Sequence, residues 1–508
     1  MFKNVQHKPR AISHDDSIFQ DLGLGKLFTH VCKLSGYNLH ELNYQPLQDP
    51  KEITYRQQVF IDIEDPTVFN ALQAFVQVIL QTGKAKGKLK YYSSIEIRNR
   101  QFVNIIDSQI KAIVRLCNSL KNSTIHSQAL KNFYQYLNNY IRSSTVLEIK
   151  AKLQTIHADF KNLNYQLKIE GRNVFVSSYS SNKETMGEEF KKIFSPLFDD
   201  PSKMLKPVKV NNSSQVSAIN NLQVDILEEL VKLYPKEFAD LNNFYKQYSQ
   251  YQENTIKNLV FEFEFYLSWA AIQKKIKEKS SLSFTLPGII TNGTEIIKDG
   301  FDLNLAINNQ QFKRNDTVTN DFCLKPDKAF LIISGPNQGG KTTYARMVGQ
   351  AYYLMNLGVP VPGSHAELKI KDNIFTHFDR QETSKQLNGL LESDIRRIHS
   401  IIERVNSKSF VILNELFSST ATADASQMGQ RVLTKLIKAG ATGIYVTFIE
   451  SLGKHDHVQS MMSQVDSSGK RMYKVIPQKL NNRAYTEILL NNFSLTQSNI
   501  EKRLHNEN

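Results

Sequence analysis

The chain has 508 residues, enough for roughly two to four domains whose cores need neither disulfides nor structural metals. Its formal net charge of +14 favours a polyanionic partner such as nucleic acid, and its three scattered cysteines (Cys32, Cys117 and Cys323) exclude a disulfide framework and a zinc site. The start MFKNVQHKPRAISHDD lacks the apolar core of a signal peptide, and no run of about 18 apolar residues appears, so we expect a cytoplasmic protein with no membrane partner.

Residues 16–160 are predicted to form a mostly helical body. VFNALQAFVQVILQTG (68–83) and FVNIIDSQIKAIVRLCNSL (102–120) place apolar residues at helical spacing. Between these two segments, GKAKGKLK (83–90) is interpreted as a solvated basic loop. Its lysines and two nearby arginines are candidate phosphate contacts: Lys84, Lys86, Lys88, Lys90, Arg98 and Arg100.

A hairpin and a second helical region are predicted next. YQLKIEGRNVFVSSY (165–179) alternates apolar and polar residues around Glu170-Gly171, and residues 199–215 have the composition of an exposed connection. From about 215 to 280 the pattern is helical, with a break near Pro235 followed by about 45 residues of helix or helix pair. This stretch suits a lever about 60 Å long, although an ordinary bundle helix would show the same periodicity. Within it, FEFEF (261–265) and Trp269 are predicted to pack in the core.

From about residue 306, short β-rich runs alternate with helices, which is typical of an α/β domain. FLIISG, FVILNE and GIYVTF are predicted to be buried parallel strands. Directly after the first of them, Gly335, Gly340, Lys341 and Thr342 complete a G-x-x-x-x-G-K-[ST] motif that leads into a helix. Such a loop turns backbone N–H groups toward phosphates, while the lysine supplies charge and the threonine hydroxyl can ligate Mg²⁺.

The strand FVILNE ends in Asn414-Glu415, at the position where P-loop enzymes place a second metal contact and a water-activating carboxylate. Together with the phosphate loop, this segment resembles the MutS family of DNA mismatch repair ATPases. ISGPNQGGKTT is similar to the family's T-G-P-N-M-G-G-K-S-T loop, and NELFSSTATADA to its D-E-L-G-R-G-T-S-T-x-D-G segment. GVPVPGSHAEL (358–368), IFTHF and FKRND (312–316) resemble further family segments, the last of them an adenine-contacting element.

The resemblance weakens toward the N-terminus. ITYRQQVFIDIED (53–65) is similar to the family's core-domain entry, and the later helices resemble the lever of short bacterial MutS-like proteins. An F-x-E mismatch motif is missing near the N-terminus, and the chain has no room before the core for mismatch-recognition and connector domains. The resemblance therefore implies an α + α/β protein, with a helical core domain (1–160), a lever or clamp-like region (161–305) and a P-loop, ABC-type ATPase domain (306–508).

The resemblance also implies a site for ATP and Mg²⁺, in which Glu415 is catalytic and Thr342 and Asn414 ligate the metal. Three departures from the family pattern bear on its activity: Asn414 replaces an aspartate, Phe448 replaces a γ-phosphate-sensing histidine, and Gly389 replaces a signature serine of the helix in 387–398. We therefore expect tight nucleotide binding with slow hydrolysis. The nucleotide-binding residues are Gly335, Pro336, Asn337, Gln338, Gly339, Gly340, Lys341, Thr342, Thr343 and Phe312.

The implied function is a DNA-binding ATPase that acts as a homodimeric clamp in mismatch repair or in recognition of damaged DNA structures. Two alternatives stay open at this point: a nucleotide-controlled clamp on RNA or ribosomes, and a pseudo-ATPase that uses ATP to hold a dimer together. Other polar residues are expected to have structural or solvent-exposed roles. They are His365, His377 and His399, and a basic run of Lys470, Arg471, Lys474, Lys479 and Arg483.

Overall fold

The computed structural model of the chain describes residues 17–34, 43–92, 94–170, 173–178, 225–251, 254–311, 317–379, 389–466, 468–481, 490 and 497. It forms two compact units, which we call the helical unit (Asp62–Glu264) and the α/β unit (Phe2–Ile61 with Phe265–Asn508). The domains expected from the sequence are contiguous, whereas the α/β unit combines both ends of the chain. The combination of helical and α/β regions agrees with the expected α + α/β class.

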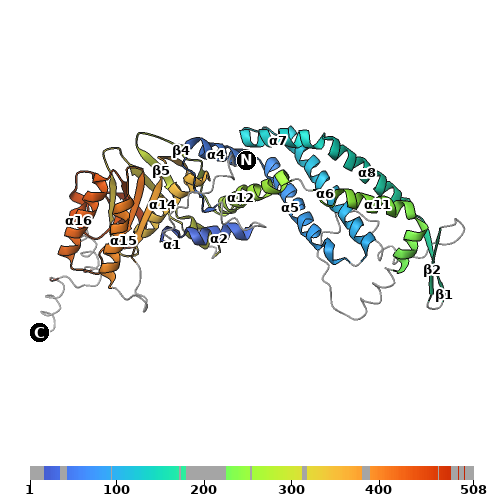
Figure 1. Ribbon diagram of the computed structural model, residues 1–508. Coiled ribbons are helices and arrows are strands. Elements are labelled where there is room, and N and C mark those ends of the chain that lie inside the picture. Colours follow the sequence, from blue (N-terminus) through green and yellow to red (C-terminus); the bar gives the residue numbers. More distant parts are fainter. Residues whose placement is uncertain are drawn as a thin grey trace. The chain divides into compact units, whose positions relative to one another are not determined.

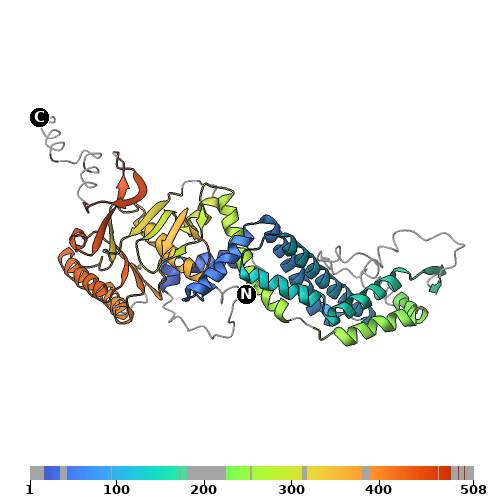
Figure 2. The same cartoon turned by 90° about the horizontal axis from the view of Figure 1, so that it is seen from above.

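Long helices make up most of the helical unit, and α5 and α6 lie side by side in both views (Figures 1 and 2). Serine N-caps begin three of the helices: the hydroxyls of Ser94, Ser127 and Ser143 each accept a hydrogen bond from the backbone N–H three residues later. The main helices are α5 (Pro66–Lys88), η1 (Leu89–Tyr91), α6 (Ile95–Asn122), α7 (Gln128–Ile141), α8 (Ser144–Lys161) and α11 (Pro235–Tyr248).

Aromatic side chains from distant parts of the sequence close the core of the helical unit. Phe160 of α8 packs edge to face on Phe238 of α11, with ring centroids 5.3 Å apart. Phe102 of α6 lies 6.0 Å from Phe244 of α11, again between ring centroids. Each of these rings is at most 7 % exposed, so their burial fixes α11 against α6 and α8.

The prediction of a loop at 83–90 was wrong, because this stretch forms the last turns of α5 and the start of η1. Gly83 and Gly87 each cost the helix about 1 kcal/mol relative to alanine. Ala85 and Leu89 nevertheless pack on the core of the unit, and Lys86 lies over the ring of Phe102. Tertiary packing thus outweighs the local preference of the two glycines.

The predicted hairpin and helix pair are confirmed. β1 (Tyr165–Glu170) and β2 (Asn173–Ser178) pair antiparallel with Glu170 opposite Asn173. The region after Pro235 forms α11 and then α12 (Asn254–Lys277), which is a pair of helices rather than one.

The predicted core packing of α12 is also confirmed. Phe263 and Phe265 are fully buried, as expected for the FEFEF segment. Trp269 is likewise fully buried and donates a hydrogen bond from Nε1 to Asn43 Oδ1 at 3.1 Å.

A six-stranded sheet with the order β10-β11-β12-β7-β13-β14 organises the α/β unit (Figure 1). The first five strands are parallel and β14 pairs antiparallel with β13. The three predicted strands are confirmed as β7 (Phe330–Ser334), β11 (Ser409–Asn414) and β12 (Thr442–Val446), all of them almost fully buried. The other strands of this sheet are β10 (Asn373–Phe378), β13 (Val458–Val465) and β14 (Arg471–Pro477).

Helices cover both faces of this sheet. Phe330 and Ile332 of β7 share a buried cluster with residues of α15 (Leu390–Arg404) and α16 (Thr422–Lys438) on one face. On the other face, the ring of Tyr352 from α14 (Lys341–Leu357) lies 4.3 Å from the ring of Phe410. This layered arrangement brings the C-terminal ends of β7, β11 and β12 to one edge of the sheet, where ligands of α/β folds bind.

A second, four-stranded sheet adjoins the first, and its strands begin earlier than the expected domain start at residue 306. Its order is β4 (Gly288–Ile289), β9 (His365–Leu368), β5 (Glu295–Gly300) and β6 (Asn320–Leu324). A short pair, β3 (Phe284–Thr285) with β8 (Val361–Pro362), and helix α13 (Leu303–Gln311) complete this part.

The N-terminal helices α1 (Ser17–Asp21) and α2 (Leu24–Leu34) belong to the α/β unit. Thr376 Oγ1 of β10 donates to Asp21 Oδ2 at 2.8 Å, and Arg346 Nε of α14 donates to the backbone oxygen of Asp21. The border between the two units falls within α4 (Pro50–Ile63) and within α12. None of the helices in the described ranges has the length and apolar content needed to cross a bilayer.

Candidate nucleotide-binding site

The loop between β7 and α14 has the backbone geometry of a phosphate cradle. Gly335 (φ 128°) and Gly340 (φ 92°) lie in the left-handed region that favours glycine. A Cβ atom on Gly335 would come within 2.9 Å of Ser463, and one on Gly339 within 2.5 Å of the Ser463 hydroxyl. These glycines are therefore required by the close approach of β13, and the loop leaves the first N–H groups of α14 directed along the helix axis.

Lys341, the first residue of α14, is held inside this loop. Its side chain is buried, and Nζ donates to the backbone oxygens of Gly335 at 2.7 Å and Pro336 at 2.9 Å. Burial lowers the pKa of Lys341 to about 8, and the nearby carboxylate of Glu415 opposes that shift. The ammonium group thus sits where a phosphate would be its natural counter-ion.

Thr342 and Asn414 meet at the same edge of the sheet. The Thr342 hydroxyl donates to Asn414 Oδ1 at 3.1 Å, which joins the start of α14 to the end of β11. Hydroxyl and amide oxygens are ligands that Mg²⁺ accepts, so the pair fits the metal expected from the sequence. Among the described residues, no group of three His, Cys, Asp or Glu side chains forms a separate metal cluster.

Glu415 follows Asn414 and is half-buried beside the loop. Its backbone has φ 57°, and its N–H donates to the backbone oxygen of Val446 on β12 at 2.9 Å. A left-handed non-glycine residue costs about 1 to 3 kcal/mol, and such residues cluster at functional sites. The backbone therefore changes direction at Glu415 and does not continue along β11.

Phe448 reaches the site from the end of β12. The ring centroid of Phe448 lies 4.3 Å from Lys341 Nζ, which is within the range of a cation–π contact. The side chain is 44 % exposed, so the ring covers the ammonium group on the solvent side. The substitution that the sequence indicated at this position thus places an aromatic face on the lysine of the phosphate loop.

The hairpin formed by β13 and β14 also contacts the phosphate loop. It was not among the site residues predicted from the sequence. Ser463 Oγ donates to the backbone oxygen of Gly339 at 2.5 Å, and Arg471 Nε donates to that of Asn337 at 2.9 Å. Tyr473, with φ 58°, lies beside Gly340. Spacing in the sequence gives no signal for these contacts, because they depend on the pairing of β13 with β7.

The remaining predicted residues fall in several places. His377 is buried with Nε2 3.0 Å from Asp394 Oδ1, while the side chains of His365 and His399 are exposed and lie near Glu367 and Glu403. In the basic run, Arg471 and Lys474 donate to backbone oxygens, so they are not simply solvated. Gly389 directly precedes α15. Phe312 and the FKRND segment, as well as Arg483, lie outside the described residues.

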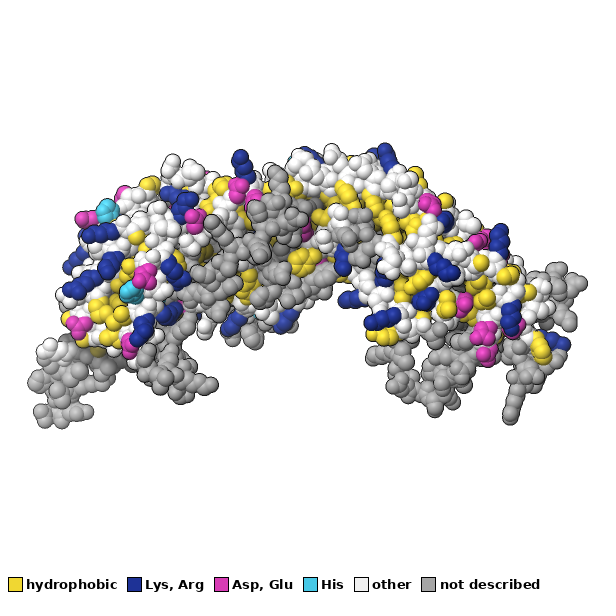
Figure 3. Space-filling model, in the orientation of Figure 1, with side chains coloured by type: hydrophobic (Ala, Val, Ile, Leu, Met, Phe, Trp, Pro, Cys, Tyr) yellow, Lys and Arg dark blue, Asp and Glu magenta, His cyan; other side chains and the backbone are white. Residues whose placement is uncertain are grey.

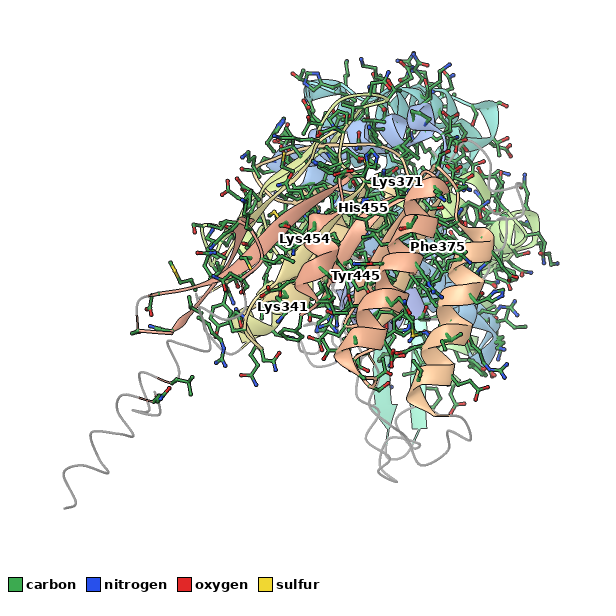
Figure 4. All side chains as sticks on the ribbon, turned by 90° about the vertical axis from the view of Figure 1, so that its left-hand side faces the viewer. Lys341, Lys371, Phe375, Tyr445, Lys454 and His455 are labelled. Atoms are coloured by element: carbon green, nitrogen blue, oxygen red, sulfur yellow. The ribbon has the colours of Figure 1, made fainter. Side chains whose placement is uncertain are left out.

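A second buried lysine lies at the opposite edge of the sheet from Lys341, as Figure 4 shows. Lys371 Nζ donates to Glu295 Oε1 at 3.1 Å and to Thr442 Oγ1 at 2.9 Å, and both side chains of the ion pair are at most 3 % exposed. Glu295 Oε2 accepts from the Tyr352 hydroxyl and from a backbone N–H. Every oxygen of this carboxylate therefore has a partner, which indicates a structural role for the network.

These features define a P-loop nucleotide-binding fold: a glycine loop between a central parallel strand and a helix, with a polar pair at the end of a neighbouring strand. Residues 331–486 match the family model described as MutS domain V. This stretch of the chain is therefore similar to a domain of the MutS family, and the resemblance expected from the sequence is confirmed for it.

Curated relatives match different lengths of the chain at 21 to 28 % identity. The DNA mismatch repair protein MutS of Lachnoclostridium phytofermentans is 21 % identical over 83 % of the chain and 47 % of its own length. The DNA mismatch repair protein MSH3 of Candida glabrata is 23 % identical over 73 % of the chain and 35 % of its own length. Endonuclease MutS2 of Thermus thermophilus is 28 % identical over 27 % of the chain and 18 % of its own length. The chain thus spans half or less of these relatives.

Proposed function

We propose that the protein is a DNA-binding ATPase with a role in mismatch repair or in recognition of DNA structure. The observation that carries the proposal is the phosphate loop, in which Lys341 is buried among backbone carbonyls next to Thr342, Asn414 and Glu415. The names of the relatives support mismatch repair, and the net charge of +14 supports a polyanionic partner.

Each residue of the site has a proposed role in holding Mg²⁺ and ATP. The backbone of Gly335, Pro336, Asn337, Gln338, Gly339 and Gly340, with Thr343, surrounds the phosphates, and Lys341 turns from the loop carbonyls to the β- and γ-phosphate oxygens. Thr342 and Asn414 would ligate Mg²⁺, which when bound neutralises charge that develops on the phosphates. Phe312 is proposed to contact the adenine.

Glu415 is proposed to orient and deprotonate the water that attacks the γ-phosphorus. The new bond joins the water oxygen to phosphorus, the bond to the bridging β–γ oxygen breaks, and ADP leaves. The hydrogen bond of the Glu415 N–H to Val446 fixes the backbone, so the carboxylate is held at a defined place on the edge of the sheet. This residue is therefore the one whose loss should affect chemistry more than binding.

Slow turnover follows from two side chains. Asn414 brings no negative charge to the metal, so it should hold Mg²⁺ more weakly than an aspartate. Phe448 has no hydrogen-bond donor for the γ-phosphate, and its ring lies over Lys341 Nζ. Both features also favour a second candidate, a pseudo-ATPase that binds ATP without hydrolysing it and uses the nucleotide to stabilise a homodimeric clamp.

Single-turnover hydrolysis of ATP separates the two candidates. We expect slow but measurable ADP formation by the wild-type protein and a loss of at least about 100-fold in Glu415→Gln, with ATP affinity kept within a few-fold. Glu403→Gln, an exposed change of the same chemistry on α15, is the matched control and should behave as wild type. Equal background rates for wild type and Glu415→Gln would instead establish the pseudo-ATPase.

A further inference from the structure

The end of α5 and η1 present a group of exposed lysines and tyrosines in the helical unit. Lys84, Lys88 and Lys90 are exposed, and Tyr91 and Tyr92 are 76 % and 43 % exposed. Lys84 and Lys88 are four residues apart on α5, so they share one face of the helix. We call these five residues the basic-aromatic tip.

No carboxylate balances the charge of the tip within its own stretch of sequence. Between Asp65 and Glu96 the chain contains no acidic residue. The ion pairs formed among the described residues do not include Lys84, Lys88 or Lys90. Lys257 of α12 adds further positive charge nearby, because its field contributes to a lowered pKa of Lys86.

Lys86 differs from the neighbouring lysines because its side chain makes contacts within the fold. Its Nζ donates to the backbone oxygen of Tyr251 at 3.2 Å and lies 5.8 Å from the ring centroid of Phe102. Burial is the larger cause of the lowered pKa of Lys86, and the charge of Lys257 lowers that pKa further. Lys84, Lys88 and Lys90 have no such internal role among the described residues, so the fold leaves them available to a partner.

The two tyrosines expose ring surface that packing of the unit does not use. The ring centroid of Tyr91 lies 5.0 Å from Lys90 Nζ, so ring and ammonium form one surface element. In Figure 3, dark-blue Lys and Arg side chains adjoin yellow hydrophobic ones over the α5–α6 part of the unit. Single-stranded nucleic acid presents both phosphates and unpaired bases. Lysines can contact its phosphates by charge, and neighbouring aromatic rings can stack on its bases.

We propose that the basic-aromatic tip binds single-stranded nucleic acid, with Lys84, Lys88 and Lys90 on phosphates and Tyr91 and Tyr92 stacked on unpaired bases. The proposal rests on the proposed function, in that nucleic acid is the partner, and it adds both the surface and the preference for an unpaired segment. We favour nucleic acid as the partner because the tip combines three lysines with two tyrosines and lacks the extended apolar face that a membrane-binding helix needs.

Fluorescence anisotropy with a labelled oligothymidine of about 30 nucleotides, and with a duplex of equal length, tests the lysines in the full chain. We expect Lys84→Ala/Lys88→Ala/Lys90→Ala to weaken binding at least about tenfold at low salt. The slope of log K against log salt should become shallower by about 2, since each single-strand phosphate contact contributes about 0.7. The matched control, Lys121→Ala/Lys131→Ala/Lys161→Ala, removes the same charge from exposed positions of the same unit and should change binding by less than about threefold.

The tyrosines are tested separately, because stacking depends on unpaired bases. Tyr91→Ala/Tyr92→Ala should weaken oligothymidine binding about tenfold or more and leave duplex binding nearly unchanged, while Tyr91→Phe/Tyr92→Phe should retain wild-type affinity. Because all five residues of the tip are exposed, the thermal unfolding midpoint of the variants is expected to stay close to the wild-type value.

Three outcomes would overturn the proposal. Equal affinities of the tip and control triple variants for the oligonucleotide would show that the tip is not the binding surface, even if the protein binds DNA elsewhere. Absence of any nucleic-acid binding by the wild-type protein would remove the DNA part of the proposed function as well. Loss of binding to anionic phosphatidylserine vesicles in the tip variants, with unchanged oligonucleotide binding, would assign the surface to a membrane.

Discussion

Two sets of lysines lie in opposite environments in the two units, buried in the α/β unit and exposed to solvent in the helical unit. In the α/β unit, Lys341 and Lys371 are buried and each has at least two hydrogen-bond acceptors. In the helical unit, Lys84, Lys88 and Lys90 stand in solvent on a stretch with no acidic residue. A buried cation requires partners fixed by the fold, whereas an exposed cluster can exchange its counter-ions for a flexible polyanion.

Within the α/β unit the two buried lysines also differ from one another. Lys371 has a full carboxylate partner whose remaining oxygen is also satisfied, so its charge is balanced inside the fold. Among the described residues, Lys341 is held by carbonyl oxygens and an aromatic ring, with the carboxylate of Glu415 near enough to influence its pKa. The difference indicates that Lys371 is structural, whereas Lys341 is placed to bind an anion.

The largest effect should come from breaking the balanced pair. Lys371→Met leaves the buried carboxylate of Glu295 without its cation, and we expect a loss of about 3 to 5 kcal/mol in the free energy of unfolding of the α/β unit. Urea unfolding followed by the fluorescence of Trp269, the only tryptophan and a buried residue of this unit, measures the loss. The double variant Lys371→Met/Glu295→Leu should recover most of the stability. A double variant as unstable as the single one would contradict the interpretation.

A smaller effect is expected from the protonation of Lys341. Its pKa of about 8 means that the Lys341 side chain is mostly charged below pH 8 and increasingly neutral above it. Phosphates favour the charged form, so ATP affinity should be highest below pH 8 and should fall by up to about tenfold per pH unit as the pH rises through that value. Titrations between about pH 7 and 9.5 measure this dependence. Lys341→Arg, which stays charged, should give a flat profile, and an equally steep fall in that variant would assign the titration to another group.

The smallest effect concerns the ring over Lys341. The Phe448 ring stabilises the ammonium group of Lys341, and phosphates would have to take the place of the ring. Phe448→Leu should therefore tighten ATP binding about threefold. Phe448→Tyr keeps an aromatic face and should bind ATP as wild type does. If Phe448→Leu bound ATP more weakly than wild type, the ring would have to contact the nucleotide itself.

Much of the α/β unit could be predicted because its signals are local. Apolar runs of five or six residues gave β7, β11 and β12, and the glycine and lysine spacing gave the loop between β7 and α14. The pairing of β13 with β7, which brings Ser463 and Arg471 to the loop, joins residues more than 120 positions apart and leaves no periodic trace.

Other differences between the predictions and the structure also arise from contacts between residues that are distant in the sequence. The segment 83–90 was predicted to be a solvated basic loop, but it is helical because Ala85 and Leu89 gain more from packing than the two glycines lose. The placement of α1 and α2 in the α/β unit depends on hydrogen bonds such as Thr376 to Asp21, which no window of sequence can reveal. Local pattern therefore predicted the elements and the loop chemistry, and long-range contacts decided what surrounds them.

If Lys341 and its loop bind the phosphates of ATP, calorimetric titration of Mg²⁺ and ATP should distinguish the wild-type protein from Lys341→Ala. We expect saturable binding to the wild-type protein and an affinity at least about 100-fold lower in the variant, because a charged hydrogen-bonding partner of the phosphates is removed. Equal ATP affinity of the two proteins, or no binding by the wild-type protein, would contradict this expectation.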